Sequence, residues 1–180
     1  MRYLKIPLER VGVLIGHNGE TKKHLEDVSN VRIDVDSDEG EVTIDEKNAK
    51  DPLSALKIES IIRAIGRGFS PQNAMKLFND DFDFFVFDIC NYVGKKESHV
   101  HRLKSRVIGR EGKTKRVLES ITESNISIYG HTISVIADIE SMDVIKKALD
   151  MLLSGSRHST VYRFIESSMK KLKLERRFGF

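Results

Sequence analysis

The feature that most constrains this chain is an internal repeat built around two Gly-x-x-Gly turns. The first copy spans Ile15–Gly19 and the second spans Ile108–Gly112, 93 residues further along. The same offset pairs residues well beyond the turns: Thr21 with Thr114, Lys22 with Lys115, Leu25 with Leu118, Glu26 with Glu119 and Ile33 with Ile126. A repeat that stays in register this far indicates two copies of one structural module.

Hydrophobic periodicity predicts the same order of elements, β-α-α-β-β-α, in both halves. In the first half it predicts a strand around residues 4–6, helices over 9–15 and 20–27, strands over 31–35 and 42–44, and a helix that Asp51 caps and Pro52 begins. On the second of these helices, Leu25 and Val28 are expected to face inward. The second half predicts strands over 84–89, 126–128 and 133–137, and helices before Gly109, over 113–123 and over 142–152.

The pattern divides the chain into four segments: a first domain over 1–68, a linker over 69–82, a second domain over 83–155 and a helical extension over 156–180. In the linker, Ser70-Pro71 predicts the start of a short helix. The extension carries an apolar stripe on one side: Val161, Phe164, Ile165, Met169 and Leu172. The first module has no such helix, so the extension is expected to join the modules or to offer a partner surface.

A Gly-x-x-Gly turn between two helices suits a nucleic acid for physical reasons. Glycine removes the Cβ atom, so a phosphate backbone can approach the main-chain amides closely. The helix that follows presents its free N–H groups, which favour an anion. KH domains hold about four nucleotides in this way. The expected fold is therefore α+β, with two tandem type I KH domains followed by a C-terminal helix.

The expected RNA-binding residues surround the two turns. In the second module, phosphate contact is expected from the glycines and the basic residues, with Ile108 and Ile126 at the floor of a base-binding groove. The candidates there are Ile108, Gly109, Arg110, Glu111, Gly112, Lys113, Lys115, Arg116 and Ile126. In the first module the candidates are Gly16, His17, Asn18, Gly19 and Lys22.

Charge distinguishes the two modules. Residues 95–116 carry nine Lys or Arg residues, Arg106 among them, and only two Glu residues. Such a cluster attracts polyanions through steering and counterion release. The predicted hairpin of the first module is acidic instead, with Asp34, Asp36, Asp38, Glu39, Glu41, Asp45 and Glu46. We therefore expect the second module to supply most of the RNA affinity.

Several other functions lack a signature in the sequence. There is one cysteine, Cys90, which is expected to be a small buried residue in a reducing, cytoplasmic protein. No apolar run approaches the 18 residues of a membrane span. His99 and His101 lack the spacing of metal ligands. No Ser/His/Asp or Cys/His nucleophile arrangement is evident, so neither a metal, a cofactor nor a catalytic residue is expected.

Longer motifs resemble one family. They are Ala64–Pro71, Leu103–Gly109, the segment Gly109–Arg116, Ile128–Gly130 and Ser159–Phe164. Together they resemble the archaeal KH proteins of small-subunit ribosome assembly, which are relatives of the eukaryotic partner-of-Nob and KRR-type processing factors. The resemblance covers nearly the whole chain. This chain differs from the eukaryotic relatives in one respect. Their first glycine turn is degenerate, whereas Gly16 and Gly19 are both present here.

The resemblance implies a non-catalytic protein that binds single-stranded RNA near the 3′ end of 16S rRNA. It implies three protein partners: the maturation endonuclease, the dimethyladenosine methyltransferase and the alpha subunit of translation initiation factor 2. Two alternatives stay open. One is a KH-fold scaffold for protein contacts in translation or RNA decay, and the other is an accessory subunit of a ribonuclease.

Overall fold

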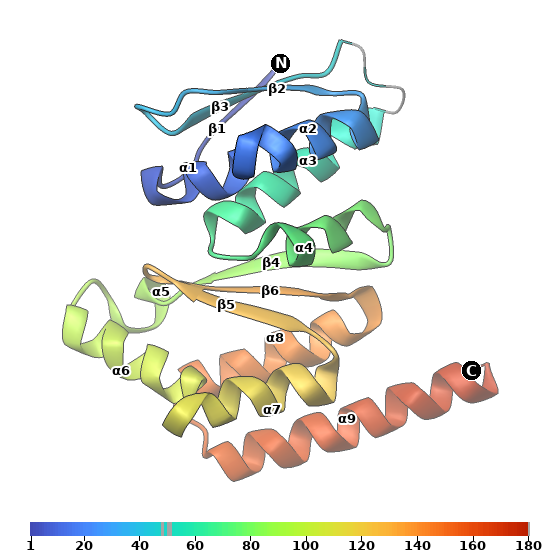
Figure 1. Ribbon diagram of the computed structural model, residues 1–180. Helices are drawn as coiled ribbons and strands as arrows, with labels where there is room; N and C mark the ends of the chain where they lie inside the picture. The colour runs from blue at the N-terminus through green and yellow to red at the C-terminus, as the bar shows by residue number, and fades with distance from the viewer. Residues whose placement is uncertain (48, 50–51, 180) are drawn as a thin grey trace. The chain divides into compact units, whose positions relative to one another are not determined.

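The computed structural model describes residues 1–47, 49 and 52–179. The chain divides into two compact units, Met1–Asp80 and Asp81–Phe180, each with its own three-stranded antiparallel sheet and covering helices (Figure 1). Each unit contains the order β-α-α-β-β-α, which confirms the fold class predicted from the repeat. The division at residues 80 and 81 falls inside the segment that the sequence predicts as a linker.

The first unit contains three strands: β1 (Arg2–Lys5), β2 (Arg32–Val35) and β3 (Glu41–Asp45). Its helices are α1 (Leu8–Ile15), η1 (His17–Gly19), α2 (Glu20–Ser29), α3 (Pro52–Gly66), α4 (Pro71–Ala74) and η2 (Met75–Phe78). The sheet order is β1-β3-β2, so the last strand of the module lies between the other two. The predicted helix cap Asp51 lies outside the described residues.

Alternation along the strands decides which sheet face is buried in the first unit. Ile33, Val42 and Ile44 are almost completely buried, and Ile44 pairs with Ile33 in the ladder. On the opposite face Tyr3 is 74% exposed and pairs with Thr43. The outer face is therefore polar, as expected for an antiparallel sheet with one covered side.

One inward-facing prediction in this unit is wrong. Val28 on α2 is 51% exposed, whereas Leu25 is buried as predicted. The helix buries Leu25 and Ser29, which are four residues apart on one face, and Ser29 Oγ donates to the Leu25 carbonyl over 2.6 Å. Val28, three residues after Leu25, falls on the exposed side of this narrow stripe.

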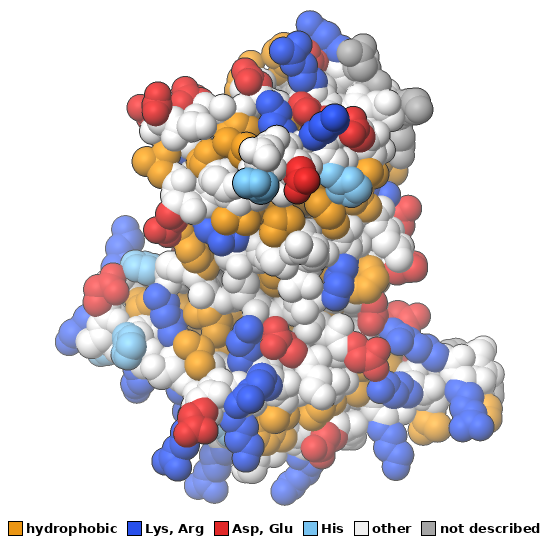
Figure 2. All heavy atoms as spheres, viewed as in Figure 1, with side chains coloured by type: hydrophobic (Ala, Val, Ile, Leu, Met, Phe, Trp, Pro, Cys, Tyr) orange, Lys and Arg blue, Asp and Glu red, His pale blue; other side chains and the backbone are white. Residues whose placement is uncertain are grey.

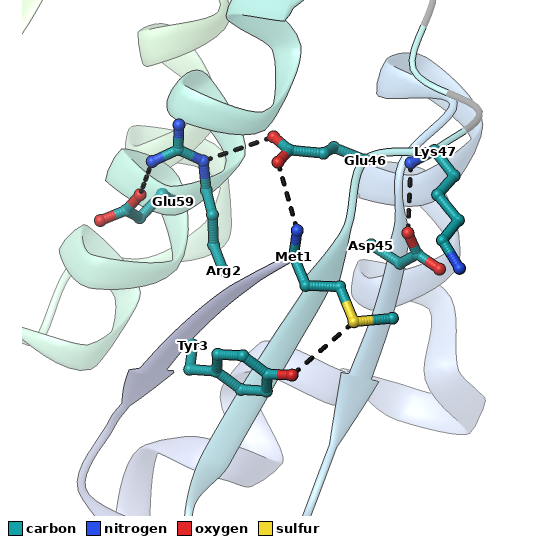
Figure 3. A network of polar contacts seen from close by, with 7 residues as sticks. All are labelled: Met1, Arg2, Tyr3, Asp45, Glu46, Lys47 and Glu59. Atoms are coloured by element: carbon teal, nitrogen blue, oxygen red, sulfur yellow. Dashed lines mark hydrogen bonds and ion pairs between the residues drawn. The ribbon is translucent and has the colours of Figure 1, made fainter.

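Charges around the N-terminus hold β1 against the end of β3 and against α3 (Figure 3). The N-terminal ammonium lies 3.3 Å from Glu46, and Arg2 lies 3.5 Å from Glu46 and 3.0 Å from Glu59. The hydrogen bond from the N-terminus, followed by the nearby positive charges, lowers the pKa of the Glu46 carboxyl. This network positions the first strand and lies at one end of the sheet.

The segment after α3 is ordered and helical. Ser70 caps α4, because its side chain accepts a hydrogen bond from the Asn73 amide over 3.3 Å, as the Ser-Pro motif predicts. Both α4 and η2 pack against α3. The residues predicted as a linker therefore contribute to the first compact unit up to Asp80.

The second unit repeats the topology with additions. Its strands are β4 (Phe82–Asp88), β5 (Asn125–Tyr129) and β6 (Thr132–Asp138), in the order β4-β6-β5. Its helices are α5 (Cys90–Val93), α6 (Glu97–Ile108), η3 (Arg110–Gly112), α7 (Lys113–Thr122), α8 (Ile139–Leu153) and α9 (His158–Phe178). Among the described residues of the first unit, no helix corresponds to the short helix α5.

The C-terminal helix α9 belongs to the second unit. It packs along α8 and α7 (Figure 1) and buries Val161, Ile165 and Met169, which lie on one face at helical spacing. Val161 and Ile165 join the same core as the α8 residues Leu149 and Leu152. The predicted apolar stripe is therefore a packing surface within the second unit.

Candidate nucleic-acid interface

The two Gly-x-x-Gly turns have the same backbone conformation. In the second turn Gly109, Glu111 and Gly112 have φ values of +75°, +52° and +74°, while in the first turn Gly16 and Gly19 have +76° and +79°. Each turn links two helices, and its last three residues form a short 3-10 helix, η1 in the first unit and η3 in the second. The repeat in the sequence therefore corresponds to a repeat of an unusual, left-handed backbone geometry.

The first glycine of each turn is needed for close packing inside the protein. A Cβ atom on Gly109 would lie 2.2 Å from Thr114 Oγ1 and 2.7 Å from the Thr114 nitrogen. A Cβ atom on Gly16 would lie 2.3 Å from Thr21 Oγ1 and 2.8 Å from the Thr21 nitrogen. The conserved spacing of glycine and threonine in the repeat thus lets the second helix start directly beneath the turn.

The second glycine of each turn faces open space instead. Around the Cβ position of Gly112 the nearest atom is Arg116 Nε at 4.0 Å, and nothing lies within 4 Å of the Cβ position of Gly19. The positive φ requires glycine, and the empty space leaves room for an external group next to the backbone. The geometry thus allows a phosphate to approach this side of the turn and the first amides of α7.

The four basic residues around the second turn differ in their contacts. Arg110, Lys113 and Arg116 are exposed. Arg116 Nη2 donates to the Glu111 carbonyl over 2.7 Å, which brings its charge close to the turn. Lys115 is half-buried and pairs with Glu119 at 3.5 Å. Among the described residues, Arg110 and Lys113 have no ion-pair or hydrogen-bond partner for their side chains.

Figure 2 shows the difference in charge between the two units on one face of the molecule. Lys and Arg side chains gather over the helices of the second unit, whereas acidic and basic side chains are mixed over the first unit. Around the first turn, the neighbouring residues are His17, Asn18 and the exposed Glu20. The first turn thus has the same backbone shape as the second with less positive charge.

The predicted floor of the base groove is only partly available. Ile108 is 37% exposed beside the second turn, and Ile15 is half-buried beside the first. Ile126 is only 3% exposed and belongs to the core, so its side chain cannot offer a stacking surface as the sequence suggested. The reason is strand alternation: Ile126 points toward α7 and the core.

A glutamate contact that the sequence analysis missed fixes the helix after each turn. Glu119 Oε1 accepts a hydrogen bond from the Ile126 amide over 2.7 Å, and Glu26 Oε1 does the same for the Ile33 amide over 2.7 Å. Both amides lie on edge strands, where one row of backbone groups lacks a strand partner. The pairing of Glu26 with Glu119 in the repeat is the sequence signal that could have revealed this role.

Arg106 has a structural role, although the sequence places it in the basic cluster. Its Nε donates to the Leu152 carbonyl over 3.0 Å and its Nη2 donates to the Ser156 carbonyl over 2.5 Å, at the end of α8. Arg10 makes the equivalent contacts in the first unit, with the carbonyls of Ile65 and Phe69 at the end of α3. Arginine at these positions satisfies helix C-terminal carbonyls, and Arg106 is not free to bind phosphate.

Hydrogen bonds to the Asp36 carboxylate and an ion pair stabilise the acidic hairpin of the first unit. Asp36 accepts hydrogen bonds from the amides of Asp38 and Glu39, over 2.8 and 3.1 Å. The bond from the Glu39 amide, followed by that from Asp38, lowers the pKa of the Asp36 carboxyl. Lys5 pairs with Glu39 at 3.4 Å. Asp36 therefore stays ionised at neutral pH, and the hairpin keeps its negative charge.

The structure brings together one cysteine and one histidine that the sequence analysis did not pair. Cys90 Sγ lies 3.4 Å from His131 Nδ1, and His131 Nε2 lies 3.1 Å from Glu97 Oε1. Cys90 is half-buried, and burial, followed by a hydrogen bond to Asp88, raises the pKa of its thiol. A raised pKa disfavours the thiolate that nucleophilic chemistry needs.

The described residues contain neither a metal-binding cluster nor a membrane-spanning helix. Within the part of the chain that the structure describes, no group of three or more His, Cys, Asp or Glu residues is placed to hold a metal ion. Among the described helices, none combines the length and the apolar character needed to cross a bilayer.

Comparison with known proteins agrees with this geometry. The family described as "Eukaryotic type KH-domain (KH-domain type I)" matches residues 83–170, and the family described as "KH domain" matches residues 1–53. A KH domain-containing protein of Methanocaldococcus jannaschii is 45% identical over 174 residues, which cover 96% of this chain and 76% of that protein. The RNA-binding protein PNO1 of Oryzias latipes is 28% identical over 117 residues, which cover 64% of this chain and 48% of PNO1.

Solved structures are similar over the whole chain. Dim2p from Pyrococcus horikoshii matches with a TM-score of 0.85 and 36% identity, covering 92% of this chain and 98% of that one. Dim2p in a complex with a/eIF2alpha and rRNA from the same organism matches with a TM-score of 0.87 and 36% identity, covering 94% of each chain. A protein of unknown function from Aeropyrum pernix matches with a TM-score of 0.93 and 32% identity, covering 99% of this chain and 95% of that one.

The fold and the two turns define a tandem KH-domain protein with type I topology. The extent of these matches shows its family: the chain belongs to the KH-domain proteins related to Dim2 and PNO1. This confirms the resemblance found in the sequence.

Proposed function

We propose that this protein binds single-stranded RNA and acts as an assembly factor of the small ribosomal subunit, near the 3′ end of 16S rRNA. One observation carries the proposal: the second turn combines open space outside Gly112 with the free side chains of Arg110 and Lys113. Donors and cations around an accessible backbone are what a sugar–phosphate chain requires. The similar Dim2p structure was solved as a complex with rRNA.

The expected contacts divide by residue type. Arg110, Lys113, Lys115 and Arg116 contact phosphates, the turn backbone at Gly109–Gly112 allows close approach, and Ile108 offers apolar surface to a base. In the first module, Gly16–Gly19 and Lys22 form a weaker site, because the acidic hairpin around Asp36 repels phosphate. Glu111 contributes through its backbone, since its carboxylate would repel a phosphate. Ile126 supports the groove from below.

The protein partners follow from the same relationship. The solved complex of Dim2p contains a/eIF2alpha, which supports the alpha subunit of translation initiation factor 2 as a partner of this chain. The maturation endonuclease and the dimethyladenosine methyltransferase stay predictions from the family resemblance. We propose that the protein acts in the cytoplasm, where ribosomal subunits assemble in archaea, and that it binds RNA without catalysis.

Two aspartate substitutions test the RNA site and its asymmetry. Gly112→Asp introduces a negative charge at the open side of the second turn and is expected to abolish RNA binding nearly completely, whereas Gly19→Asp is expected to weaken it less. The measurement is a filter-binding titration with an oligonucleotide from the 3′ end of 16S rRNA. Equal losses for the two variants would contradict the asymmetry.

Gly179 offers a matched control for these variants. It also has a positive φ of +68° with nothing near its Cβ position, and it follows the far end of α9. A helix rises about 1.5 Å per residue, so Gly179 lies about 30 Å along α9 from its first turn. Gly179→Asp should therefore leave RNA affinity unchanged, which separates a local effect from a general effect of charge.

Two measurements distinguish this function from the alternatives. If the protein binds RNA through several phosphates, the logarithm of its affinity falls linearly with the logarithm of salt concentration. Absence of salt-dependent RNA binding would favour a scaffold that uses its KH folds for protein contacts only. Incubation of labelled RNA with the protein and Mg²⁺ should leave the RNA intact, and cleavage would overturn the non-catalytic proposal.

A further inference from the structure

An open cavity borders the Gly-x-x-Gly turn of the second unit. Its volume is about 690 Å³, and it is lined by residues of α6, the turn, α7 and α9. The lining residues are His101, Arg102, Ser105, Arg106, Gly109, Arg110, Thr114, His158 and Tyr162. The cavity lies on the α9 side of the turn, while Lys115 and Glu119 of α7 face the edge strand β5.

The chemistry of this cavity is cationic and aromatic. No Asp or Glu is among the lining residues. Arg102 and Arg110 are exposed, and neither side chain has a hydrogen-bond or ion-pair partner among the described residues. Three aromatic rings are among the lining residues: His101 and the neighbouring pair His158 and Tyr162, whose ring centroids are 6.3 Å apart. This combination suits a nucleotide, because arginine binds phosphate and a flat ring accepts a base.

The rings of His158 and Tyr162 are held in place by hydrogen bonds. Tyr162 donates its hydroxyl to Thr114 Oγ1 over 3.0 Å, and His158 Nε2 lies 2.9 Å from the Arg106 carbonyl. Thr114 is the same residue that packs beneath Gly109. A ligand would meet a preformed surface, which reduces the entropy lost on binding.

The first unit lacks the parts that make this cavity. The repeat places Leu8, Glu9 and His17 at the positions of His101, Arg102 and Arg110. The helix at the position of α9 is α4, which starts five residues after the end of α3, as α9 starts five residues after the end of α8. It is a single short turn, and Pro71 and Met75 stand at the positions of His158 and Tyr162, so the first unit has no equivalent of the two rings. The cationic and aromatic lining is therefore a feature of the second unit.

We propose that this cavity is a subsite for one further nucleotide of the RNA strand, next to the nucleotides that cross the turn. Arg102 and Arg110 contact the phosphate on either side of that nucleotide, and its base or ribose lies against Tyr162 and His158. The inference rests on the proposed RNA-binding function and specifies a path for the strand. It gives α9 a role in binding in addition to its role in packing.

Oligonucleotides of graded length test the subsite. A KH groove holds about four nucleotides. The test therefore measures, by fluorescence anisotropy, the affinity for a four-nucleotide RNA and for RNAs extended by one or two nucleotides at either end. Extension at one end should tighten binding by about 5- to 150-fold, the range measured for stacking of one base. Extension at the other end should have a smaller effect.

Three variants assign this gain to the cavity. Arg102→Gln removes an unpaired charge, and Ser105→Phe fills the cavity from an exposed helix position without changing charge. Both should lose most of the gain from extension and keep the affinity for the four-nucleotide RNA. Arg163→Gln, an equal loss of charge on an exposed residue of α9 outside the cavity lining, should keep the gain.

The outcomes separate the two proposals. If the wild-type protein binds none of the RNAs, the proposed function itself fails. If it binds them and both cavity variants keep the full gain, the subsite is overturned while the function stands. A 4-thiouridine at the added position should crosslink to Tyr162 or His158, and a crosslink only to residues outside the cavity would contradict the subsite. Binding of free AMP in the cavity without any gain from extension would also overturn it, in favour of a mononucleotide site.

Discussion

The two glycines of the second turn should respond differently to the same substitution. In Gly109→Ala the new methyl group would lie 2.2 Å from Thr114 Oγ1 and 2.7 Å from the Thr114 nitrogen, and Thr114 is buried. Overpacking of this kind costs about 1–3 kcal/mol. The backbone at Gly109, with φ +75° and ψ 174°, lies in a region essentially restricted to glycine, which costs any other residue about 1–3 kcal/mol more. We therefore expect Gly109→Ala to lower the free energy of unfolding by about 2–6 kcal/mol.

Gly112→Ala should be much less destabilising. Its methyl group meets nothing closer than Arg116 Nε at 4.0 Å, so only the conformational cost of roughly 1–2 kcal/mol applies. Because the methyl group occupies the open space outside the turn, this variant should weaken RNA binding while the protein stays folded. Gly109→Ala and Gly112→Ala thus separate the packing role of one glycine from the binding role of the other.

Urea denaturation followed by circular dichroism measures this difference. In thermal unfolding, a change of 1 kcal/mol shifts the midpoint by roughly 4–8 °C for a domain of up to about 100 residues, so the two variants should be clearly resolved. Gly16→Ala repeats the test in the first unit, since its methyl group would lie 2.3 Å from Thr21 Oγ1. The reasoning is refuted if Gly112→Ala destabilises the protein as much as Gly109→Ala does.

Two further predictions concern stability. Glu119→Ala leaves the Ile126 amide without its hydrogen-bond acceptor at 2.7 Å and should lower the free energy of unfolding by about 1–3 kcal/mol. Glu119→Gln keeps an acceptor oxygen and should be less destabilising. Equal urea midpoints for the two variants would contradict this role of Glu119. Tyr92 donates its hydroxyl to Asp150 over 2.8 Å, and burial, followed by this bond, raises the pKa of Tyr92 to about 12. The folded state therefore holds the phenolic proton more tightly than the unfolded state, so this stabilisation is present below about pH 10 and is lost as the pH rises toward 12. The stability difference between wild type and Tyr92→Phe should shrink between about pH 10 and pH 12, and a constant difference would count against it.

The fold was predictable because the sequence contains two copies of one module, which can be compared with each other. Each half confirms the other, so weak signals such as a single Gly-x-x-Gly turn become strong when they recur at the same offset with the same periodicity around them. The helix expected over 20–27 is α2 (Glu20–Ser29), and the helical extension expected over 156–180 contains α9 (His158–Phe178). These boundaries follow from local preferences, which the chain keeps in the folded state.

The contacts around the site were not predictable for an equally physical reason. Arg106 binds a carbonyl 46 residues away, Tyr162 binds Thr114 48 residues away, and Cys90 lies beside His131 41 residues away. Periodicity indicates which face of a helix is covered but not which side chain meets it. Arg106 therefore looked like one more member of a basic cluster, and Ile126 looked like a groove residue although alternation buries it.

The two units show that backbone geometry alone does not decide the function of a KH turn. Their turns have nearly the same torsion angles, with Gly16 and Gly109 at +76° and +75°. Any difference in RNA affinity must therefore come from the side chains and helices around them. The second turn has unpaired cations and an adjoining helix α9, while the first unit has the ionised, folded hairpin around Asp36. The turn geometry in both copies leaves room for a phosphate, and the surrounding residues are the basis of our proposal that the RNA strand binds mainly to the second.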